Sequence, residues 1–367
     1  MPANDSAEPR LEDLLSWVRD TTGAEPLQSE RLPTVRPMWW LSLRDAEGER
    51  SLFLRCERPG EFGHARFYPV AREAAVLAAL APSGLPVPRV IACHQHPAAL
   101  LMTAMPGSAD FAALAADPPR KQRVVADFMR LLAAQHALDV HALGLDTVLP
   151  APADPTAHAR AELDTWERIW REATGHGDAL LDFAAGWLRE RLPASPETVL
   201  VHGDTGPNQC HYAGDGICAL LDWELAHLGD PMEDLGCLAA RGGMEDFGEP
   251  RLLFAEYARH AARTVDLPRV AWYRILALFK FAAATGLARE GAGDAAQASP
   301  VALWDAQLRY LLAWCLATAA GEPVQPLQPL GAGSAVAALH DAELPRMAAV
   351  RDRFGEQAIT LWFHPLV

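Results

Sequence analysis

The sequence predicts an α+β protein of two lobes, a small antiparallel β-sheet with one helix followed by a larger, mainly helical lobe. Strand-like residues separated by turn residues fill much of the first hundred positions, whereas helical spacing dominates after Pro106. A chain of 367 residues is long for one domain and suits two lobes that share a cleft. We therefore expect lobes at residues 1–105 and 106–320, followed by a Pro-rich connector and tail at 321–367.

The first lobe combines a helix, a β-hairpin and a further helix and strand. Apolar residues recur at helical spacing over Arg10–Thr22. Met38–Leu43 and Ser51–Cys56 are rich in aromatic and aliphatic residues, and the turn residues between them predict a hairpin. A helix is expected over Ala71–Leu80, and an apolar strand over Ala99–Met105.

The second lobe is predicted to be helical apart from one β-like island. Thr198–Val201 and Gly216–Leu221 are short apolar runs on either side of a polar loop. We also expect a last helix over Ala335–Arg353. The main helices are expected over Arg120–Asp139, Ala157–Ala173, Ala179–Arg191, Glu249–Val265, Val270–Glu290 and Val301–Ala319.

Charge and composition exclude several classes of function. The net charge of −15 argues against a nucleic-acid partner, whose phosphates need a basic surface. The apolar stretches Val270–Ala288 and Val301–Ala320 each contain charged residues, so we expect buried helices and no membrane span. The N-terminus has no signal-peptide pattern, and the six cysteines are scattered, which favours a reduced cytoplasmic location. The sequence makes no prediction of oligomeric state.

Two aspartates carry the strongest chemical signal. Asp204 and Asp222 each follow a short apolar strand, and the hairpin between them should bring both carboxylates to one end of a cleft. Phosphoryl transfer uses one carboxylate to accept the proton of the attacking hydroxyl and another to hold Mg²⁺. Alternatively, Asp204 caps a turn and Asp222 begins a helix. The surrounding His-Gly-Asp and Gly-Asp-Pro sequences favour the catalytic interpretation.

These motifs resemble those of the aminoglycoside phosphotransferase-like kinases, which share the two-lobed protein-kinase-like fold. The family's H-G-D loop matches His202-Gly203-Asp204, its D-W-E segment matches Asp222-Trp223-Glu224, and its G-D-P-x-x-D-L signature matches Gly229–Leu235. The stretch Leu220–Leu235 is most similar to the branch attached to some acyl-CoA dehydrogenases. The resemblance extends over most of residues 10–320.

The resemblance implies roles for individual residues of the second lobe. Asp204 would be the catalytic base and Asp222 a ligand of Mg²⁺. His202, Asp230 and Asp234 would brace the catalytic loop by hydrogen bonds.

In the first lobe, the family pattern needs a strand cation that contacts phosphate and a helix carboxylate paired with it. Arg55 and Glu73 occupy these places, although each also fits an ordinary surface position. Backbone groups of Thr103 and Met105, on the strand that leads to the second lobe, are expected to bind adenine.

The sequence departs from the family in two places. The segment before the hairpin, RLPTVRPMWWLSL, contains no glycine, whereas many relatives have a Gly-rich loop over the phosphates there. In the catalytic loop the metal-binding Asn is expected five positions after Asp204, where this chain has Gln209, and Asn208 lies one position early. Either amide oxygen can bind Mg²⁺; we favour Gln209.

The resemblance implies an enzyme that transfers phosphate from ATP, or another nucleoside triphosphate, to a hydroxyl group of a small molecule. The dehydrogenase-linked branch suggests a hydroxyacyl-CoA or another apolar catabolic alcohol. The resistance enzymes and the negative net charge suggest an aminoglycoside. Residues 270–320 are dominated by Trp, Leu, Ala and Phe, which favours the apolar alcohol. A catalytically weak, nucleotide-sensing binding protein remains the alternative from another class.

Overall fold

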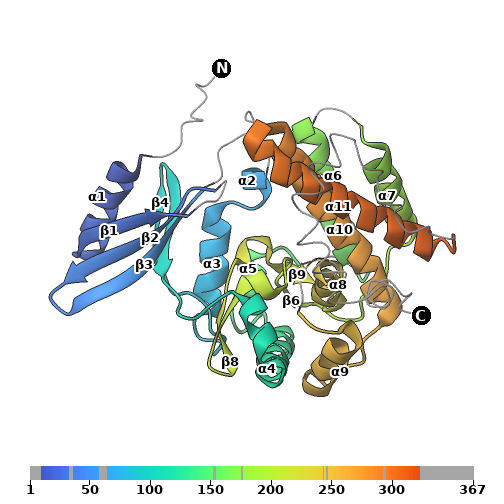
Figure 1. Cartoon of the computed structure of the whole chain (residues 1–367), viewed down its shortest axis with the longest axis horizontal. Helices are drawn as coiled ribbons and strands as arrows, with labels where there is room; N and C mark the ends of the chain where they lie inside the picture. Colours follow the sequence, from blue (N-terminus) through green and yellow to red (C-terminus); the bar gives the residue numbers. More distant parts are fainter. Residues whose placement is uncertain are drawn as a thin grey trace.

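The computed structural model describes residues 10–32, 36–57, 64–151, 154–174, 177–242, 244, 247–291 and 295–322. The helix expected over Ala335–Arg353 and most of the connector lie outside these residues. Figure 1 shows a β-sheet at one end of the molecule and a group of helices at the other.

The small lobe is a five-stranded antiparallel sheet with the strand order β1-β2-β3-β5-β4. The hairpin predicted from the sequence pairs β2 with β3 in an unbroken register from Met38 opposite Arg55 to Asp45 opposite Gly48. The edge strand β1 was not predicted. The strands are β1 (Glu25–Arg31), β2 (Met38–Asp45), β3 (Gly48–Cys56), β4 (Val90–Gln95) and β5 (Ala98–Thr103).

Two helices flank this sheet. Helix α1 (Leu11–Thr22) buries Leu14 and Val18 against alternate residues of β2 and β3, in a separate core of the small lobe. Helix α3 (Val70–Leu80) packs beside β5, and its apolar residues belong to the core of the large lobe. In Figure 1, α3 lies between the sheet and the helical lobe, so it can carry side chains to the boundary.

The large lobe is built around two long helices, α10 and α11, and the short helix α8. Gly236 of α8 lies so close to α10 that a β-carbon there would be 2.6 Å from Cβ of Tyr273. This close approach fixes α8, which follows directly on the acidic segment. The helices are α4 (Pro118–His136), α5 (Leu145–Val148), α6 (Ala157–Thr174), α7 (Ala179–Glu190), α8 (Met232–Arg241), α9 (Pro250–Ala261), α10 (Leu267–Gly291) and α11 (Ala295–Ala319), with the single-turn α2 (His64–Phe67) before α3.

The predicted β-like island forms two small antiparallel pairs, β6 with β9 and β7 with β8. The loop between β6 and β7 contains Asp204, and β8 ends two residues before Asp222, so the hairpin carries both aspartates to one end as expected. The strands are β6 (Val199–Val201), β7 (Cys210–Ala213), β8 (Gly216–Leu220) and β9 (His227–Gly229). Three short 3₁₀ turns accompany them: η1 (Phe111–Ala116), η2 (Pro207–Gln209) and η3 (Trp223–Leu225).

In the described part of the chain, each helix is too short or too polar to span a lipid bilayer.

Candidate active site

Asp234 holds the loop that follows β6. Its carboxylate accepts hydrogen bonds from the backbone amides of His202, at 2.9 Å, and Gly203, at 3.0 Å, and from the hydroxyl of Thr205. The side chain of His136 on α4 adds a further bond at 2.9 Å. Burial alone would raise the pKa of this carboxyl, but these bonds hold the pKa well below its ordinary value. Asp234 is therefore a buried anion around which the loop is wrapped.

The backbone at position 203 shows why the His-Gly-Asp sequence needs a glycine. Its φ of 83° lies in the left-handed region, and a β-carbon at this position would be 2.6 Å from the carbonyl oxygen of Leu225. The His202 ring packs on Trp223 with centroids 4.7 Å apart, and its Nε2 lies 2.8 Å from the carbonyl oxygen of Leu221. His202 therefore ties the loop to the segment around Asp222.

Asp204 projects from this loop with 17% of its side chain exposed. Its Oδ1 forms an ion pair with Arg241 at the end of α8, and its Oδ2 accepts a 2.9 Å hydrogen bond from the side-chain amide of Gln209. Burial raises the pKa of Asp204 above its ordinary value, while Arg241 opposes the rise.

Gln209 and Asn208 have different surroundings. Asn208 is exposed, whereas Gln209 is buried beside Asp204. Within the described residues, the Oε1 atom of Gln209 is buried without a hydrogen-bond partner. A buried amide oxygen of this kind is suited to a hard cation or a water molecule.

Asp222 meets the small lobe through Arg55. The guanidinium of Arg55 lies 2.6 Å from Asp222, 3.0 Å from Glu73 on α3 and 3.3 Å from Glu224. Asp222 itself adopts a left-handed conformation, with φ 64° and ψ 54°, which is uncommon for an aspartate and turns the chain sharply after β8. The structure therefore brings together Arg55, Glu73 and Asp222 from three separate elements.

Residues 41–273, well over half of the chain, match the model of the phosphotransferase enzyme family. The chain belongs to this family. The expected resemblance to aminoglycoside phosphotransferase-like enzymes is thereby confirmed, as is the expected class, a phosphotransferase with an alcohol group as acceptor.

Curated relatives of this phosphotransferase include acyl-CoA dehydrogenase family members. It is 26% identical over 267 residues to family member 11 of Rattus norvegicus, which covers 64% of this chain and 33% of the relative. It is 28% identical over 249 residues to family member 10 of Mus musculus, covering 64% of this chain and 22% of the relative. The phosphotransferase thus matches a third or less of these relatives' length.

Solved structures share the fold of the phosphotransferase. A ternary complex of aminoglycoside phosphotransferase APH(4)-Ia with ADP and hygromycin B superposes with a TM-score of 0.58 at 15% identity, covering 82% of this chain and 98% of that one. The macrolide 2′-phosphotransferase MphH from Brachybacterium faecium superposes with a TM-score of 0.51 at 19% identity, covering 81% and 98%. The expected two-lobed fold is confirmed.

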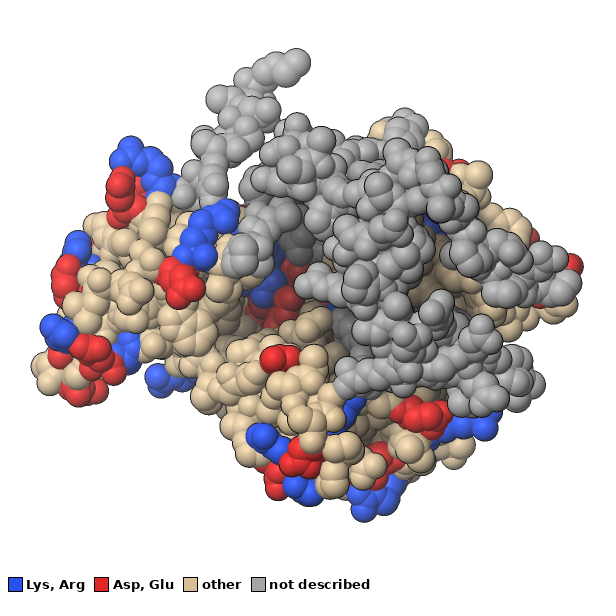
Figure 2. Space-filling view, in the orientation of Figure 1, with Lys and Arg blue, Asp and Glu red and all other residues tan. Residues whose placement is uncertain are grey.

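Two arginines that were not predicted from the sequence, Arg36 and Arg72, also contact the segment after β8. Arg36, which precedes β2, lies 2.5 Å from Glu224, and both side chains are buried. Arg72 on α3 donates to the carbonyl oxygens of Glu224, at 2.9 Å, and Ala226. In Figure 2, basic and acidic side chains gather in the hollow between the two lobes of the phosphotransferase.

A buried cluster of four ionisable side chains lies beneath the catalytic loop. Lys280 on α10 donates to Glu162 at 3.0 Å and to Glu233 at 3.1 Å, and its Nζ lies 3.4 Å from the carbonyl oxygen of Gly203. His227 lies 3.1 Å from Glu233. Burial opposes protonation of His227, but the two carboxylates raise its pKa to about 9. Two cations thus balance two anions, with the lysine ammonium bridging the carboxylates.

Asp230, which is expected to brace the loop, has described side-chain contacts at the start of α8 and with Arg269. Its carboxylate accepts a 2.9 Å bond from the amide of Met232 at the start of α8 and lies 3.2 Å from Arg269. These contacts therefore fix the start of α8, and Asp234, four residues later, contacts the loop directly.

At the lobe boundary, the chain after β5 is tied to β7. Ser108 and Tyr212 exchange two backbone hydrogen bonds of 3.0 Å. The amide of Thr103 donates to the carbonyl oxygen of Arg89 at 2.9 Å, and its hydroxyl oxygen lies 3.9 Å from the sulfur of Met105. Thr103 therefore already uses its amide within the sheet.

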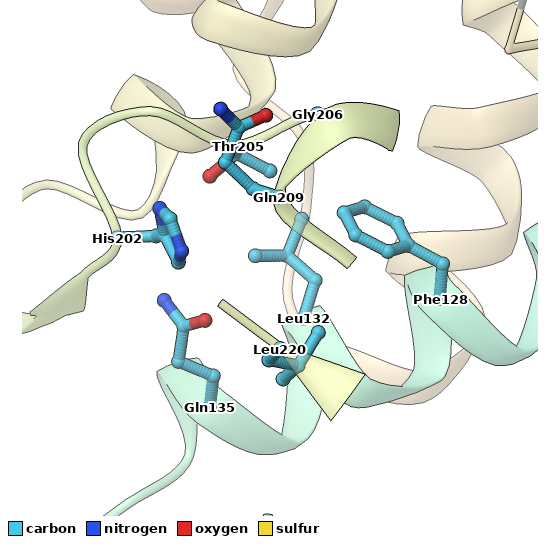
Figure 3. A pocket seen from close by; sticks show the side chains of 8 residues that line it. All are labelled: Phe128, Leu132, Gln135, His202, Thr205, Gly206, Gln209 and Leu220. Carbon is cyan, nitrogen blue, oxygen red and sulfur yellow. The ribbon is translucent and has the colours of Figure 1, made fainter. Parts of the chain in front are cut away.

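A small cavity lies behind the catalytic loop, between the loop and α4. Its volume of about 10 Å³ is near the smallest that holds one water molecule. It is therefore too small for a nucleotide or an acceptor, but it places a water-sized space beside Gln209. Figure 3 shows the lining side chains: Phe128, Leu132, Gln135, His202, Thr205, Gly206, Gln209 and Leu220.

Proposed function

We propose that this phosphotransferase transfers the γ-phosphate of ATP to a hydroxyl group of a small, apolar metabolite, with a hydroxyacyl-CoA as the favoured class. The observation that carries the proposal is the contact of Arg55 with both Glu73 and Asp222. Kinase-type transfer uses a strand cation paired with a helix carboxylate, and a further carboxylate that holds Mg²⁺; Arg55, Glu73 and Asp222 bring these three kinds of group together. The acyl acceptor is supported by the acyl-CoA dehydrogenase relatives.

In this proposal Asp204 accepts the proton of the acceptor hydroxyl as its oxygen bonds to the γ-phosphorus and the bond to the leaving ADP breaks. The hydroxyl must lie within about 2.6–3.2 Å of the carboxylate. Arg55 steadies phosphate oxygens from the small-lobe side. Most of the rate enhancement is then a matter of positioning and of neutralising charge.

Asp222 and Gln209 would hold Mg²⁺, which when bound neutralises charge on the nucleotide phosphates. The buried, unpartnered Oε1 of Gln209 supports its assignment over the exposed Asn208. His202, Asp230 and Asp234 would brace the loop and α8 without taking part in the chemistry. Backbone groups of Thr103, through its carbonyl, and of Met105 would bind adenine. A neighbour of the same fold was solved with ADP, which supports nucleotide use.

The lobes would divide at residues 1–105 and 106–320, with a cytoplasmic location and no nucleic-acid partner. An aminoglycoside acceptor is the second candidate, supported by the hygromycin B complex of a structural neighbour and by the net charge of −15. A nucleotide-sensing protein without transfer is the third.

The three candidates are separated by one screen with Mg²⁺–ATP. Wild-type protein and Asp204→Asn are incubated with hydroxyacyl-CoAs, simple apolar alcohols and aminoglycosides, and phosphorylated product is detected by mass spectrometry. We expect transfer to a hydroxyacyl-CoA and a loss of at least about 100-fold in Asp204→Asn. Transfer to aminoglycosides alone would establish the second candidate. Nucleotide binding without transfer to any acceptor, unchanged by Asp204→Asn, would establish the sensor.

A further inference from the structure

Arg241 contacts the expected base from the large lobe. Arg55, Glu73 and Asp222 approach the site from the small lobe, whereas Arg241 reaches Asp204 from the end of α8 in the large lobe. Its contact with Oδ1, together with the Gln209 bond to Oδ2, leaves both oxygens of Asp204 already bonded to a donor. A carboxylate has about four acceptor sites, so an incoming hydroxyl can still bind Asp204 and would then share the carboxylate with the guanidinium.

The guanidinium is held in place from several sides. It lies over the ring of Phe281 at 5.1 Å, and a β-carbon at Gly206 would be 2.4 Å from Cδ of Arg241. Only 10% of the Arg241 side chain is exposed. Because the backbone of the catalytic loop packs on its stem, Arg241 cannot turn away without moving that loop. It is therefore a fixed part of the site.

A guanidinium held in one place discriminates between the functional groups that can bind beside it. Arginine offers five N–H donors and no acceptor, so it can donate to oxygen atoms of carboxylates and carbonyl groups, whereas an ammonium group, itself only a donor, gains no hydrogen bond from it. Among the described residues, three buried carboxylates of the large lobe are already paired with cations. Glu162 and Glu233 are bridged by Lys280, and Asp305 is paired with Arg309 at 3.0 Å.

We propose that Arg241 is a specificity-determining residue that binds the acyl oxygen of the acceptor next to its reacting hydroxyl, so that hydroxy acids and their thioesters are accepted and amino alcohols are rejected. This inference rests on the proposed function for the transfer step, but binding of the acyl group can be measured without transfer. In this inference Arg241 binds the acyl oxygen of the acceptor, whereas Asp204 acts on its hydroxyl.

The test uses probes that differ only in the group beside the hydroxyl. A hydroxybutyrate series with the hydroxyl on each carbon in turn is prepared as free acids and coenzyme A thioesters. The corresponding butanediols and aminobutanols are the uncharged and cationic counterparts. Binding is measured by calorimetry in the presence of a non-hydrolysable ATP analogue and Mg²⁺, and transfer is measured separately by product mass.

We expect wild-type protein to bind at least one acyl probe more tightly than its diol and amino counterparts by on the order of 10- to 100-fold, as for one charge-assisted hydrogen bond. Arg241→Gln should lose this preference, and Arg241→Lys should keep part of it. Affinity for the ATP analogue should stay within about twofold in both variants, as expected if Arg241 contacts the acceptor and not the nucleotide. Arg123→Gln, which removes an exposed ion pair with Asp215, is the matched control and should behave like the wild type.

The results of these measurements distinguish the inference about Arg241 from the proposed phosphotransfer function. Acyl binding that depends on Arg241 in a protein that transfers no phosphate supports this inference and defeats the proposed function. Transfer with the same acceptor preference in wild type and Arg241→Gln, or wild-type protein that binds no acyl probe better than its amino counterpart, overturns this inference. Thermal unfolding of each variant shows whether it is folded, and if Arg241→Gln is not, the comparison of Arg241→Lys with wild type decides.

Discussion

The side-chain amide of Gln209 donates a 2.9 Å hydrogen bond to Oδ2 of Asp204, so the proposed metal ligand and the proposed base are in direct contact. The nitrogen of this amide faces the carboxylate, and its oxygen is left for another partner. Gln209 thereby links the proposed proton acceptor to the proposed metal site. Substituting Gln209 therefore tests the proposal more directly than substituting Asn208.

We expect Gln209→Ala to lower metal-dependent turnover by about 10- to 100-fold, because both a metal ligand and a partner of Asp204 are removed. Asn208→Ala is the matched control and should lower turnover by less than about threefold, since Asn208 is exposed. ADP formation is followed as a function of Mg²⁺ concentration for both variants. The reverse order of effects would mean that Asn208 is the ligand.

Asp234→Asn should destabilise the protein and reduce activity together. The carboxylate accepts bonds from two backbone amides and one hydroxyl of the loop, and an amide side chain would turn an N–H group toward some of these donors. Loss of a buried hydrogen-bonded charge is expected to cost about 3–5 kcal/mol. Urea unfolding gives the free energy. Asp215→Asn, at an exposed ion pair, should change it by less than about 1 kcal/mol.

The His227 cluster predicts a loss of stability on the alkaline side. The pKa of His227 is raised to about 9 in the folded protein from an ordinary value near 6.5. A raised pKa contributes stability that is fully present below the unfolded value and is lost as pH rises through the folded value. We expect the free energy of unfolding to fall between pH 6.5 and 9 by on the order of 3 kcal/mol.

This pH dependence is checked by urea unfolding across that range in wild type and His227→Gln. The variant titrates no group at this position, so its unfolding free energy should change less over the same window. Equal slopes for the two proteins would show that His227 is not held as a cation between Glu162 and Glu233.

Two glycines on helices give opposite predictions for the same substitution. Gly236→Ala places a β-carbon 2.6 Å from Cβ of Tyr273 and 2.7 Å from its backbone, so it should force α8 and α10 apart and cost about 1–3 kcal/mol. Gly186 on α7 has no atom within 4 Å of such a carbon, so Gly186→Ala should stabilise by about 0.4–1 kcal/mol. The midpoints of thermal unfolding should move in opposite directions. A stabilised Gly236→Ala would contradict the close helix contact.

The elements that the sequence revealed are those with strong apolar patterns. The β2–β3 hairpin and the strands β6 and β8 of the β-like island were expected at nearly their observed positions, whereas β7 and β9 were not expected as strands. Strand β1, Glu25–Arg31, was missed because its residues are mostly exposed and polar, and it pairs only with β2 at the edge of the sheet. A strand that buries so little has no hydrophobic alternation to detect.

The residues of the site could be predicted where they lie close together in the sequence, but not where distant segments bring them together. Asp204, Asp222 and Asp234 lie in one short run and could be predicted from motif spacing. Arg241 is 37 residues from Asp204, and Lys280 is 77 residues from Gly203. Their contacts depend on how α8 and α10 pack, which no local pattern encodes. The lysine within the apolar run of α10 was the one available signal, because an isolated charge in a buried helix needs a partner.

The arginines that reach from the small lobe to Glu224 also have a kinetic consequence. Arg36, Arg55 and Arg72 all bond to residues 222–226, and Trp223 anchors that segment in the core of the large lobe. Separating the lobes would strip several buried charges of their partners at once, so the open form is costly. In the proposed catalytic cycle, ADP would leave through this open form. We therefore expect escape of ADP, and not the chemical step, to set the pace of the catalytic cycle.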